Sequence, residues 1–225
     1  HVVTDPPYSE HVHSNSRRGA KAQAASFIDG YSRQRDLGFG SLTTGIRGGV
    51  ADQIARVVSR WVLVFSDTES AHLWRSALEQ AGLDYIRTCF WDRLSSAPQF
   101  TGDRPAVACE AITVCHPPGR KHWNGGGKRG IYPVPVEGGQ RGEPRLHPTQ
   151  KPLALMRALV EDFTDPGDVI IDPFSGSGTT GLACRSGRRF IGWELDPEHA
   201  RTAQLRLAGD DYNPTPGQLT LLGGI

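Results

Sequence analysis

The feature that most constrains the fold is the stretch VIIDPFSGSGTTGLACRSGRRFIGWELD near the C-terminus. A short apolar run predicts a strand over Val169–Asp172, and a glycine-rich turn leads from it into a helix over Gly178–Ser186. A second strand follows over Arg189–Glu194. A strand, turn, helix and strand in this order form a parallel pair joined by a crossover helix. Glycines in the turn can adopt backbone torsions that other residues avoid, so the backbone can approach a ligand closely.

The turn predicts a site for a cofactor that contains a nucleoside. The pattern G-S-G-T-T-G from Gly176 to Gly181 also suits a nicotinamide dinucleotide, and an ordinary tight turn is a further alternative. Asp172 at the strand tip would repel a pyrophosphate but attract an ammonium group, and Phe174 can pack on a nucleoside. Glu194, 18 positions after Gly176, is suited to bond ribose hydroxyls. These features favour S-adenosylmethionine, which has a cationic amino acid end and an adenosine end.

The N-terminal stretch HVVTDPPY predicts a second loop at a sheet edge. Two successive prolines cannot continue a helix or donate to a sheet ladder. We therefore expect a stiff, extended loop after a strand at Val2–Thr4, with a rigid surface turn as the alternative. This loop presents the Asp5 carboxylate, the Pro6 carbonyl and the Tyr8 ring in a set order.

Predicted strands and helices alternate along the chain. The further strands are Arg60–Ser66, Tyr85–Trp91 and Ala106–Cys115, and the further helices are Val50–Ser59, Ser70–Ala81, 152–163 and Pro197–Leu207. The alternation predicts an α/β fold with a mostly parallel sheet covered on both faces. We expect a long polar insertion over Ser9–Gly49, partly helical around Ala20–Tyr31, and a C-terminal tail that passes from ordered to frayed.

Basic residues gather in two polar stretches, although the net charge is only +1. In 116–146 they are Arg120, Lys121, Lys128, Arg129, Arg141 and Arg145, against Glu137 and Glu143. In 9–50 they are Arg17, Arg18, Lys21, Arg33, Arg35 and Arg47, against Glu10, Asp29 and Asp36. Basic loops on an otherwise balanced domain suit a phosphate backbone, and solvated surface loops are the alternative.

Several classes of protein are disfavoured by composition. The 4 cysteines are scattered without a CxxC pair, so we expect reduced thiols and neither a disulfide framework nor a metal site. No apolar run approaches the roughly 20 residues of a membrane helix, so no membrane association is expected.

Three motifs together resemble one enzyme family. DPPY at 5–8, HPTQKP at 147–152 and DPFSGSGTT at 172–180 resemble, in this order, the DNA amino-methyltransferases of the beta arrangement. The resemblance covers roughly Val2 to Leu207. It implies a Rossmann-like class I methyltransferase fold, permuted, whose mostly parallel sheet has an antiparallel strand pair near one edge.

The resemblance also implies one catalytic domain with four parts. Residues 1–115 form a catalytic half that carries the basic insertion 9–50, and residues 116–146 form a loop-rich target-recognition region. Residues 147–208 form the cofactor-binding half, and 209–225 form the tail. Family members usually carry a strand and an acidic residue upstream of DPPY, so we expect that the start of this chain is trimmed; partial substitution by the C-terminal AGDDY at 208–212 is the alternative.

Each motif residue has an implied role. Asp5 and the Pro6 carbonyl accept hydrogen bonds from the target amino group, Tyr8 stacks on the flipped base, and Lys151 pairs with the methionine carboxylate of the cofactor. The implied catalytic residues are Asp5, Pro6, Pro7 and Tyr8. The implied cofactor-binding residues are Asp172, Phe174, Ser175, Gly176, Ser177, Gly178, Thr179, Glu194, Thr149 and Lys151. The candidate DNA contacts are Arg17, Arg18, Lys21, Lys121, His122, Trp123, Asn124, Lys128 and Arg129.

The implied reaction is sequence-specific methylation of a flipped adenine at N6 in double-stranded DNA, with S-adenosylmethionine as the methyl donor. A cytosine N4-methyltransferase, a non-catalytic DNA-binding relic and a nicotinamide-dependent oxidoreductase are the alternatives. Within the family, Asp before Pro-Pro-Tyr favours adenine. The resemblance implies a bacterial or phage-encoded enzyme in the cytoplasm, and a homodimer and a cognate restriction endonuclease are compatible with it.

Overall fold

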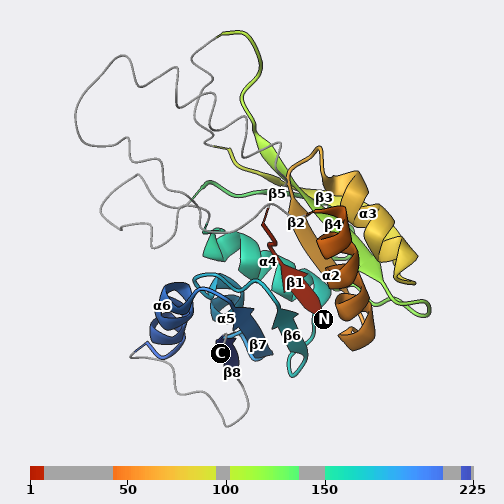
Figure 1. Ribbon diagram of the computed structural model, residues 1–225. Helices are drawn as coiled ribbons and strands as arrows, with labels where there is room; N and C mark the ends of the chain where they lie inside the picture. The colour runs from red at the N-terminus through yellow and green to blue at the C-terminus, as the bar shows by residue number, and fades with distance from the viewer. Residues whose placement is uncertain (8–42, 95–101, 137–149, 210–218, 224–225) are drawn as a thin grey trace.

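The computed structural model describes residues 1–7, 43–94, 102–136, 150–209 and 219–223, which include one eight-stranded sheet with the order β5-β3-β4-β2-β1-β6-β7-β8 (Figure 1). The strands are β1 (Val2–Thr4), β2 (Val62–Ser66), β3 (Asp84–Asp92), β4 (Cys109–His116), β5 (Ile131–Pro133), β6 (Val169–Asp172), β7 (Arg189–Glu194) and β8 (Leu219–Gly223). Only β4 runs antiparallel to its neighbours, which are β2 and β3, among the described strand pairs. The predicted α/β fold, with a mostly parallel sheet and an antiparallel pair near one edge, is confirmed.

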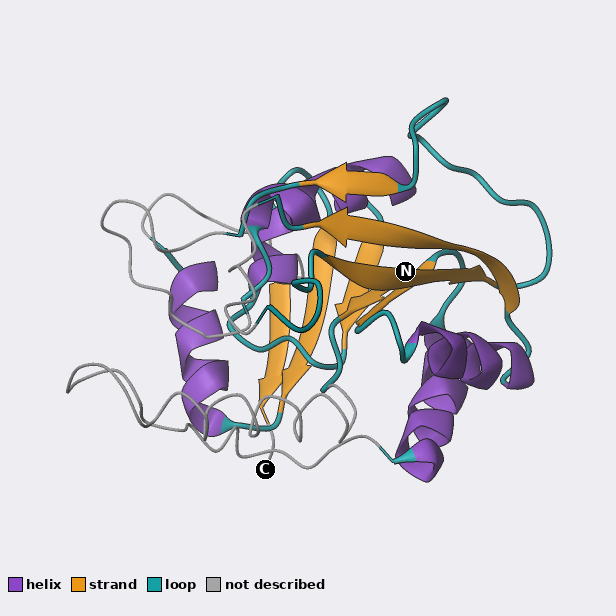
Figure 2. Cartoon of the chain, turned by 90° about the horizontal axis from the view of Figure 1, so that it is seen from above, coloured by secondary structure: helices purple, strands orange, loops and turns teal. Residues whose placement is uncertain are grey.

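Helices lie on either side of the strands (Figure 2). They are α2 (Thr44–Val57), α3 (Ala71–Gln80), α4 (Leu153–Phe163), α5 (Thr179–Ala183) and α6 (Pro197–Leu207). Successive side chains of β2 point to opposite faces, since a strand has a period of two. Leu63 and Phe65 therefore join the core with α4, whereas Val62 and Val64 join the core with α2 and α3.

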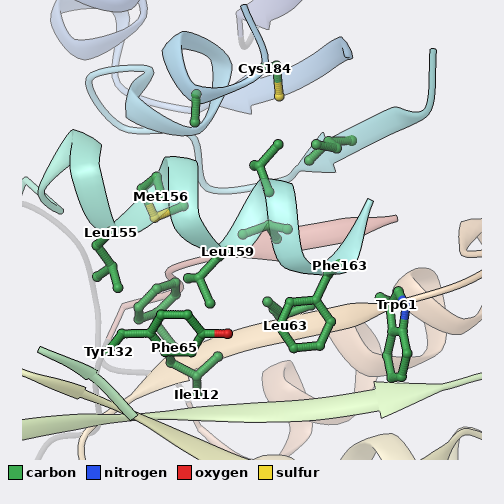
Figure 3. Close-up of a cluster of buried hydrophobic side chains, with 14 of the residues drawn as sticks. Trp61, Leu63, Phe65, Ile112, Tyr132, Leu155, Met156, Leu159, Phe163 and Cys184 are labelled. Atoms are coloured by element: carbon green, nitrogen blue, oxygen red, sulfur yellow. The ribbon is translucent and has the colours of Figure 1, made fainter. Parts of the chain in front are cut away.

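The larger core lies between α4 and the strands. Leu155, Leu159 and Phe163 recur every four residues, so they share one face of α4. Figure 3 shows these three side chains pointing toward Phe65 and Leu63 of the sheet. Leu159 is completely buried, so this face anchors α4 across the central strands.

Helix α2 and strands β5 and β8 differ most from the sequence prediction, and the other predicted elements in the described ranges differ by a few residues at most. Helix α2 begins at Thr44 rather than Val50, because the hydroxyl of Thr43 caps it by accepting a hydrogen bond from the Ile46 amide. The predicted helix around Ala20–Tyr31 lies outside the described residues. Strands β5 and β8 were not predicted, since their pairing with β3 and β7 is a long-range contact.

None of the helices in the described ranges is long and apolar enough to cross a membrane. The division of the chain at residues 116 and 147 stays a prediction.

Candidate active site

The two predicted loops leave the sheet side by side. Strands β1 and β6 are parallel neighbours, with Val2 paired to Ile171, so their carboxyl ends meet at the same edge of the sheet. The Thr4 hydroxyl donates a hydrogen bond of 2.7 Å to Oδ1 of Asp172 and ties the two strand ends together. We call this edge, where β1, β2, β6 and β7 end, the carboxyl edge. The Asp5–Pro7 loop and the glycine turn both begin there.

Asp172 is a buried carboxylate that organises this edge. Its Oδ1 also accepts the amide of Phe174 at 3.1 Å, and its Oδ2 accepts the Thr180 hydroxyl at 2.6 Å. Burial raises the pKa of the Asp172 carboxyl to about 6, although these hydrogen bonds lower it, and the nearby charge of Asp5 raises it further. The structure thus gives Asp172 three protein donors, and its predicted contact with an ammonium group stays a prediction.

The glycine turn has the backbone geometry that the sequence predicted. Gly176 and Gly178 have φ values of +50° and +80°, a region that glycine occupies without strain. Both the amide and the hydroxyl of Ser175 donate to the Trp193 carbonyl, at 2.9 and 3.0 Å. Gly178 then serves as the N-cap of α5, so the turn joins β6 to that helix.

Arg206 stabilises the second half of the glycine turn, where it leads into α5. Nη1 of Arg206 on α6 donates to the carbonyl and the hydroxyl of Ser177, at 2.5 and 2.9 Å, and to the Thr179 hydroxyl at 3.3 Å. Ser177 and Thr179 are buried and engaged within the protein. They shape the turn in this structure, and their contact with a cofactor stays a prediction.

Glu194 ends β7 next to the turn. Its Oε2 accepts the Gly176 amide at 2.8 Å and its Oε1 accepts the Asp196 amide at 2.9 Å. Each carboxylate oxygen can accept a further hydrogen bond. Glu194 is thus suited to bond hydroxyl groups of a ligand that lies over the turn.

An apolar hollow of about 450 Å³ adjoins the turn. Phe174 and Pro173 line it from the turn, Trp193 lines it from β7, and Ile46 and Val50 line it from α2. This volume is within the usual range for small-molecule sites. Sequence reasoning missed Trp193, although alternation along β7 could have placed it on the face opposite the buried Phe190.

Lys151 lies among carboxylates of the protein itself. Its Nζ is 2.5 Å from Oδ2 of Asp5 and 3.0 Å from Oε2 of Glu110, and the residue is 7% exposed. Burial alone would lower the pKa of the Lys151 ammonium, but Asp5 and Glu110 outweigh burial and raise it. The structure gives Lys151 two protein carboxylates as partners. Its contact with a cofactor carboxylate, which the resemblance implied, stays a prediction.

Sequence reasoning missed Glu110, which pairs with both Lys151 and Arg93. Because β4 is antiparallel to its neighbours, its first residues rather than its last lie at the carboxyl edge. The resemblance implied an antiparallel pair near one edge but not which strand runs against its neighbours, and Glu110 could be identified only from the direction of β4.

Four of the candidate DNA contacts lie at the opposite edge of the sheet, after the end of β4. The Lys121 ammonium is 2.9 Å from Asp84, and Trp123 packs beside Phe163 in the core. The carbonyl of His122 accepts the Trp61 indole N–H at 2.6 Å. The Asn124 amide group donates to the Thr164 carbonyl at 3.0 Å and to Asp165 at 2.9 Å. The structure does not bring these four residues to Asp5.

Lys128 and Arg129 are also distant from Asp5. Lys128 lies 2.5 Å from Asp162, near the end of α4 that is far from Lys151. With Arg129 it borders a separate hollow of about 310 Å³. The remaining candidates Tyr8, Arg17, Arg18, Lys21 and Thr149 lie outside the described residues.

Comparison with known proteins agrees with this geometry. A family model described as DNA methylase, for N6 and N4 methyltransferases, matches residues 1–205. The type II methyltransferase M.XycI of Xanthomonas campestris pv. cyanopsidis is 33% identical over 159 residues, which are 62% of this chain and 50% of that protein. The DNA adenine methyltransferase YhdJ of Escherichia coli K12 is 48% identical over 62 residues, 27% of this chain and 21% of that protein. Each of these matches spans half of the relative's length or less.

Solved structures share the fold. The complex of M1.HpyAVI with S-adenosylmethionine has a TM-score of 0.65 at 24% identity, and covers 92% of this chain and 88% of that one. The cytosine-N4-specific PvuII DNA methyltransferase has a TM-score of 0.64 at 15% identity, and covers 94% of this chain and 80% of that one. Because the family model matches 205 of the 225 residues, the chain belongs to the N6/N4 DNA methylase family.

Proposed function

We propose that this protein transfers a methyl group from S-adenosylmethionine to the exocyclic amino nitrogen of a base in double-stranded DNA, with adenine N6 as the acceptor. The observation that carries the proposal is the meeting of two loops at the carboxyl edge. The parallel pairing of β1 with β6, and the hydrogen bond from Thr4 to Asp172, hold the Asp5 loop beside the glycine turn. Family membership supports the same activity.

The residues around the glycine turn fit S-adenosylmethionine. A Cβ built on Gly176 would meet no atom within 4 Å, so a ligand can approach the backbone there. The Glu194 carboxylate keeps acceptor capacity for ribose hydroxyls while it holds the Gly176 amide. Phe174 and its neighbours offer an apolar hollow of about 450 Å³ for the nucleoside part.

The chemistry required of the protein is orientation. When bound, S-adenosylmethionine supplies a methyl group activated by a sulfonium charge. An exocyclic amino group is a poor nucleophile, because its lone pair is delocalised into the ring. The Asp5 carboxylate and the Pro6 carbonyl can each accept one amino hydrogen, which turns the lone pair out of the ring plane toward the methyl group. Alignment of this kind supplies much of the rate, and the Asp5 carboxylate can accept the proton that the nitrogen loses on methylation.

The target base must leave the duplex before it can reach Asp5. Extrusion costs a few kcal/mol, and we propose that the Tyr8 ring recovers part of this cost by stacking on the base. We also propose that the protein acts on DNA in the cytoplasm of a bacterial cell. A homodimer and a cognate restriction endonuclease stay predictions.

Adenine is the proposed base because Asp precedes Pro-Pro-Tyr. Cytosine N4 is the second candidate, since a carboxylate accepts the amino hydrogens of either base equally well. One named relative is an adenine methyltransferase, and one structural neighbour is cytosine-N4-specific.

The test is an assay of methyl transfer with identification of the product. Genomic DNA from a methylation-deficient host is incubated with labelled S-adenosylmethionine, digested to nucleosides and separated by chromatography. We expect N6-methyladenine. Label in N4-methylcytosine would replace the adenine proposal with the second candidate, and absence of label on any base would overturn the proposed activity.

A variant pair connects the activity to Asp5. Asp5→Asn should reduce transfer by at least about 100-fold, the scale set by loss of a well-positioned group, while cofactor affinity in calorimetry changes little. Asp103→Asn makes the same chemical change at an exposed surface pair with Arg104 and should leave transfer unchanged. Loss of cofactor binding in Asp5→Asn would mean that Asp5 supports the structure rather than the reaction.

A further inference from the structure

Four charged side chains of alternating sign form a chain at the carboxyl edge. They run from Arg93 through Glu110 and Lys151 to Asp5. We propose that Glu110 is a positioning residue for methyl transfer: it holds the Lys151 ammonium, which in turn holds and charge-balances the Asp5 carboxylate. This inference rests on the proposed role of Asp5.

The geometry makes the chain a single unit. Lys151 Nζ bridges the two carboxylates, at 2.5 Å to Asp5 Oδ2 and 3.0 Å to Glu110 Oε2. The residues come from separate parts of the fold, since Asp5 follows β1, Glu110 lies near the start of β4, and Lys151 precedes α4. No local turn could bring them together, so their meeting depends on the tertiary fold.

Burial makes each charge depend on its neighbour. Glu110 is 4% exposed and Lys151 is 7% exposed. Lys151 Nζ also lies over the rings of Phe65 and Trp91, at 5.1 and 5.9 Å from their centroids. An ammonium group enclosed by aromatic rings and carboxylates stays charged only while the carboxylates balance it.

The two partners of Lys151 have different roles. If Lys151 faced Asp5 alone, its full positive charge would weaken Asp5 as a hydrogen-bond acceptor. The negative charge of Glu110 offsets part of the positive potential that Lys151 exerts on Asp5, and the ion pair fixes the position of the ammonium group. Asp5 is then held in one orientation yet remains negative enough to accept the hydrogens of an amino group.

The other charged groups near Asp5 also have partners among the described residues. Arg93 neutralises the outer end of Glu110, and its guanidinium stacks over Trp91 with 5.3 Å between the Arg93 Cζ atom and the ring centroid. Two further carboxylates of this edge also have partners: Asp172 accepts hydrogen bonds from Thr4, Phe174 and Thr180, and Glu194 accepts the Gly176 amide. The order of charges therefore predicts opposite effects when Glu110 or Lys151 is neutralised.

The experiment compares three variants in two measurements. The variants are Glu110→Gln, Lys151→Met and the control Glu79→Gln, which removes a carboxylate from a surface pair on α3. The first measurement is the pH profile of kcat for methyl transfer. The second is the pH at which the Asp5 carboxyl titrates, followed by carbon-13 NMR without DNA or cofactor and assigned by the signal lost in Asp5→Asn.

We expect the two substitutions to move the titration in opposite directions. Lys151→Met removes the cation beside Asp5, so the midpoint and the acid limb of the kcat profile should rise by about one pH unit or more. Glu110→Gln removes a negative charge that offsets Lys151, so the titration midpoint of Asp5 and the acid limb of the kcat profile should both move to lower pH. Glu110→Gln should also lower kcat about 10-fold with KM changed less than about 2-fold, because orientation rather than binding is lost. Glu79→Gln should match the wild-type protein.

The outcomes separate this inference from the proposed function. If the wild-type protein transfers no methyl group, the proposed function fails, and the NMR midpoints still test the charge network. The inference is overturned if the Glu110→Gln and Lys151→Met midpoints move in the same direction or do not move, or if Glu110→Gln keeps the wild-type kcat. Should Lys151→Met fail to fold, Glu110→Gln decides alone, since it keeps the shape of Glu110 and the contact between Lys151 and Asp5.

Discussion

Replacement of Gly181 by alanine should destabilise the protein, although alanine is the better helix former. Gly181 lies in α5, directly behind the glycine turn. A Cβ at this position would lie 2.8 Å from Cδ2 of Leu207 and 2.8 Å from Cδ1 of Phe190. The Leu207 side chain can change its rotamer, but the Phe190 ring is completely buried and cannot move away without displacing its neighbours.

The magnitude follows from two opposing terms. Alanine in place of glycine within a helix gains about 1 kcal/mol in the free energy of unfolding. Overpacking a rigid core costs about 1–3 kcal/mol. We expect a net loss of about 1 kcal/mol, which lowers Tm by about 2–4 °C in a domain of this size.

Gly49→Ala is the matched control, because Gly49 is an exposed helical residue of α2 and a Cβ built on it would meet no atom within 4 Å. The same chemical change should there raise the free energy of unfolding by about 0.5–1 kcal/mol. Urea denaturation followed by circular dichroism measures both variants. Equal or greater stability of Gly181→Ala relative to Gly49→Ala would refute the packing argument.

Three further predictions concern the core, the buried carboxylate and the opposite edge. Leu159→Ala should lower the free energy of unfolding by about 2–5 kcal/mol in urea denaturation, because Leu159 is completely buried. The Asp172 pKa rises from 3.8 to about 6 on folding, so the native state binds more protons between these values. Stability relative to Asp172→Asn should therefore be greatest below about pH 4 and fall by about 3 kcal/mol as the pH rises through 6, whereas a constant difference would contradict burial as the cause. Asn124→Ala should lower the free energy of unfolding by about 0.5–1.5 kcal/mol through its bonds to Thr164 and Asp165. It should leave KM for DNA unchanged, since Asn124 lies at the edge opposite Asp5; a large rise in KM would instead support its predicted DNA contact.

Local patterns predicted much of the fold. The strands at Val2–Thr4, Val169–Asp172 and Arg189–Glu194, and the helix at Pro197–Leu207, have the predicted bounds. Each is a short apolar or amphipathic run bounded by proline, glycine or acidic residues, so its limits are local. Strand β5 escaped prediction because three residues carry no periodic pattern, and only pairing with β3 makes them a strand.

The candidate site divides in the same way. The torsions of the glycine turn and the position of Glu194 at a strand end were predictable from sequence, because both are local properties. Their contacts with a cofactor stay predictions. The contacts of Lys121 with Asp84 and of Asn124 with Asp165 could not be predicted. A basic, polar loop has the same composition whether it contacts DNA or packs against other segments of the protein.

The sequence by itself determined which two loops leave the carboxyl edge of the sheet and which chemical groups they carry, since these follow from motifs of a few adjacent residues. Only the tertiary structure decided which groups meet. Lys151, just before α4, reaches Asp5, just after β1. Glu110 joins them because β4 runs against its neighbours and returns its first residues to that edge. The direction of a strand in a sheet is settled by pairing between distant segments, and that pairing is not encoded in any single stretch of the chain.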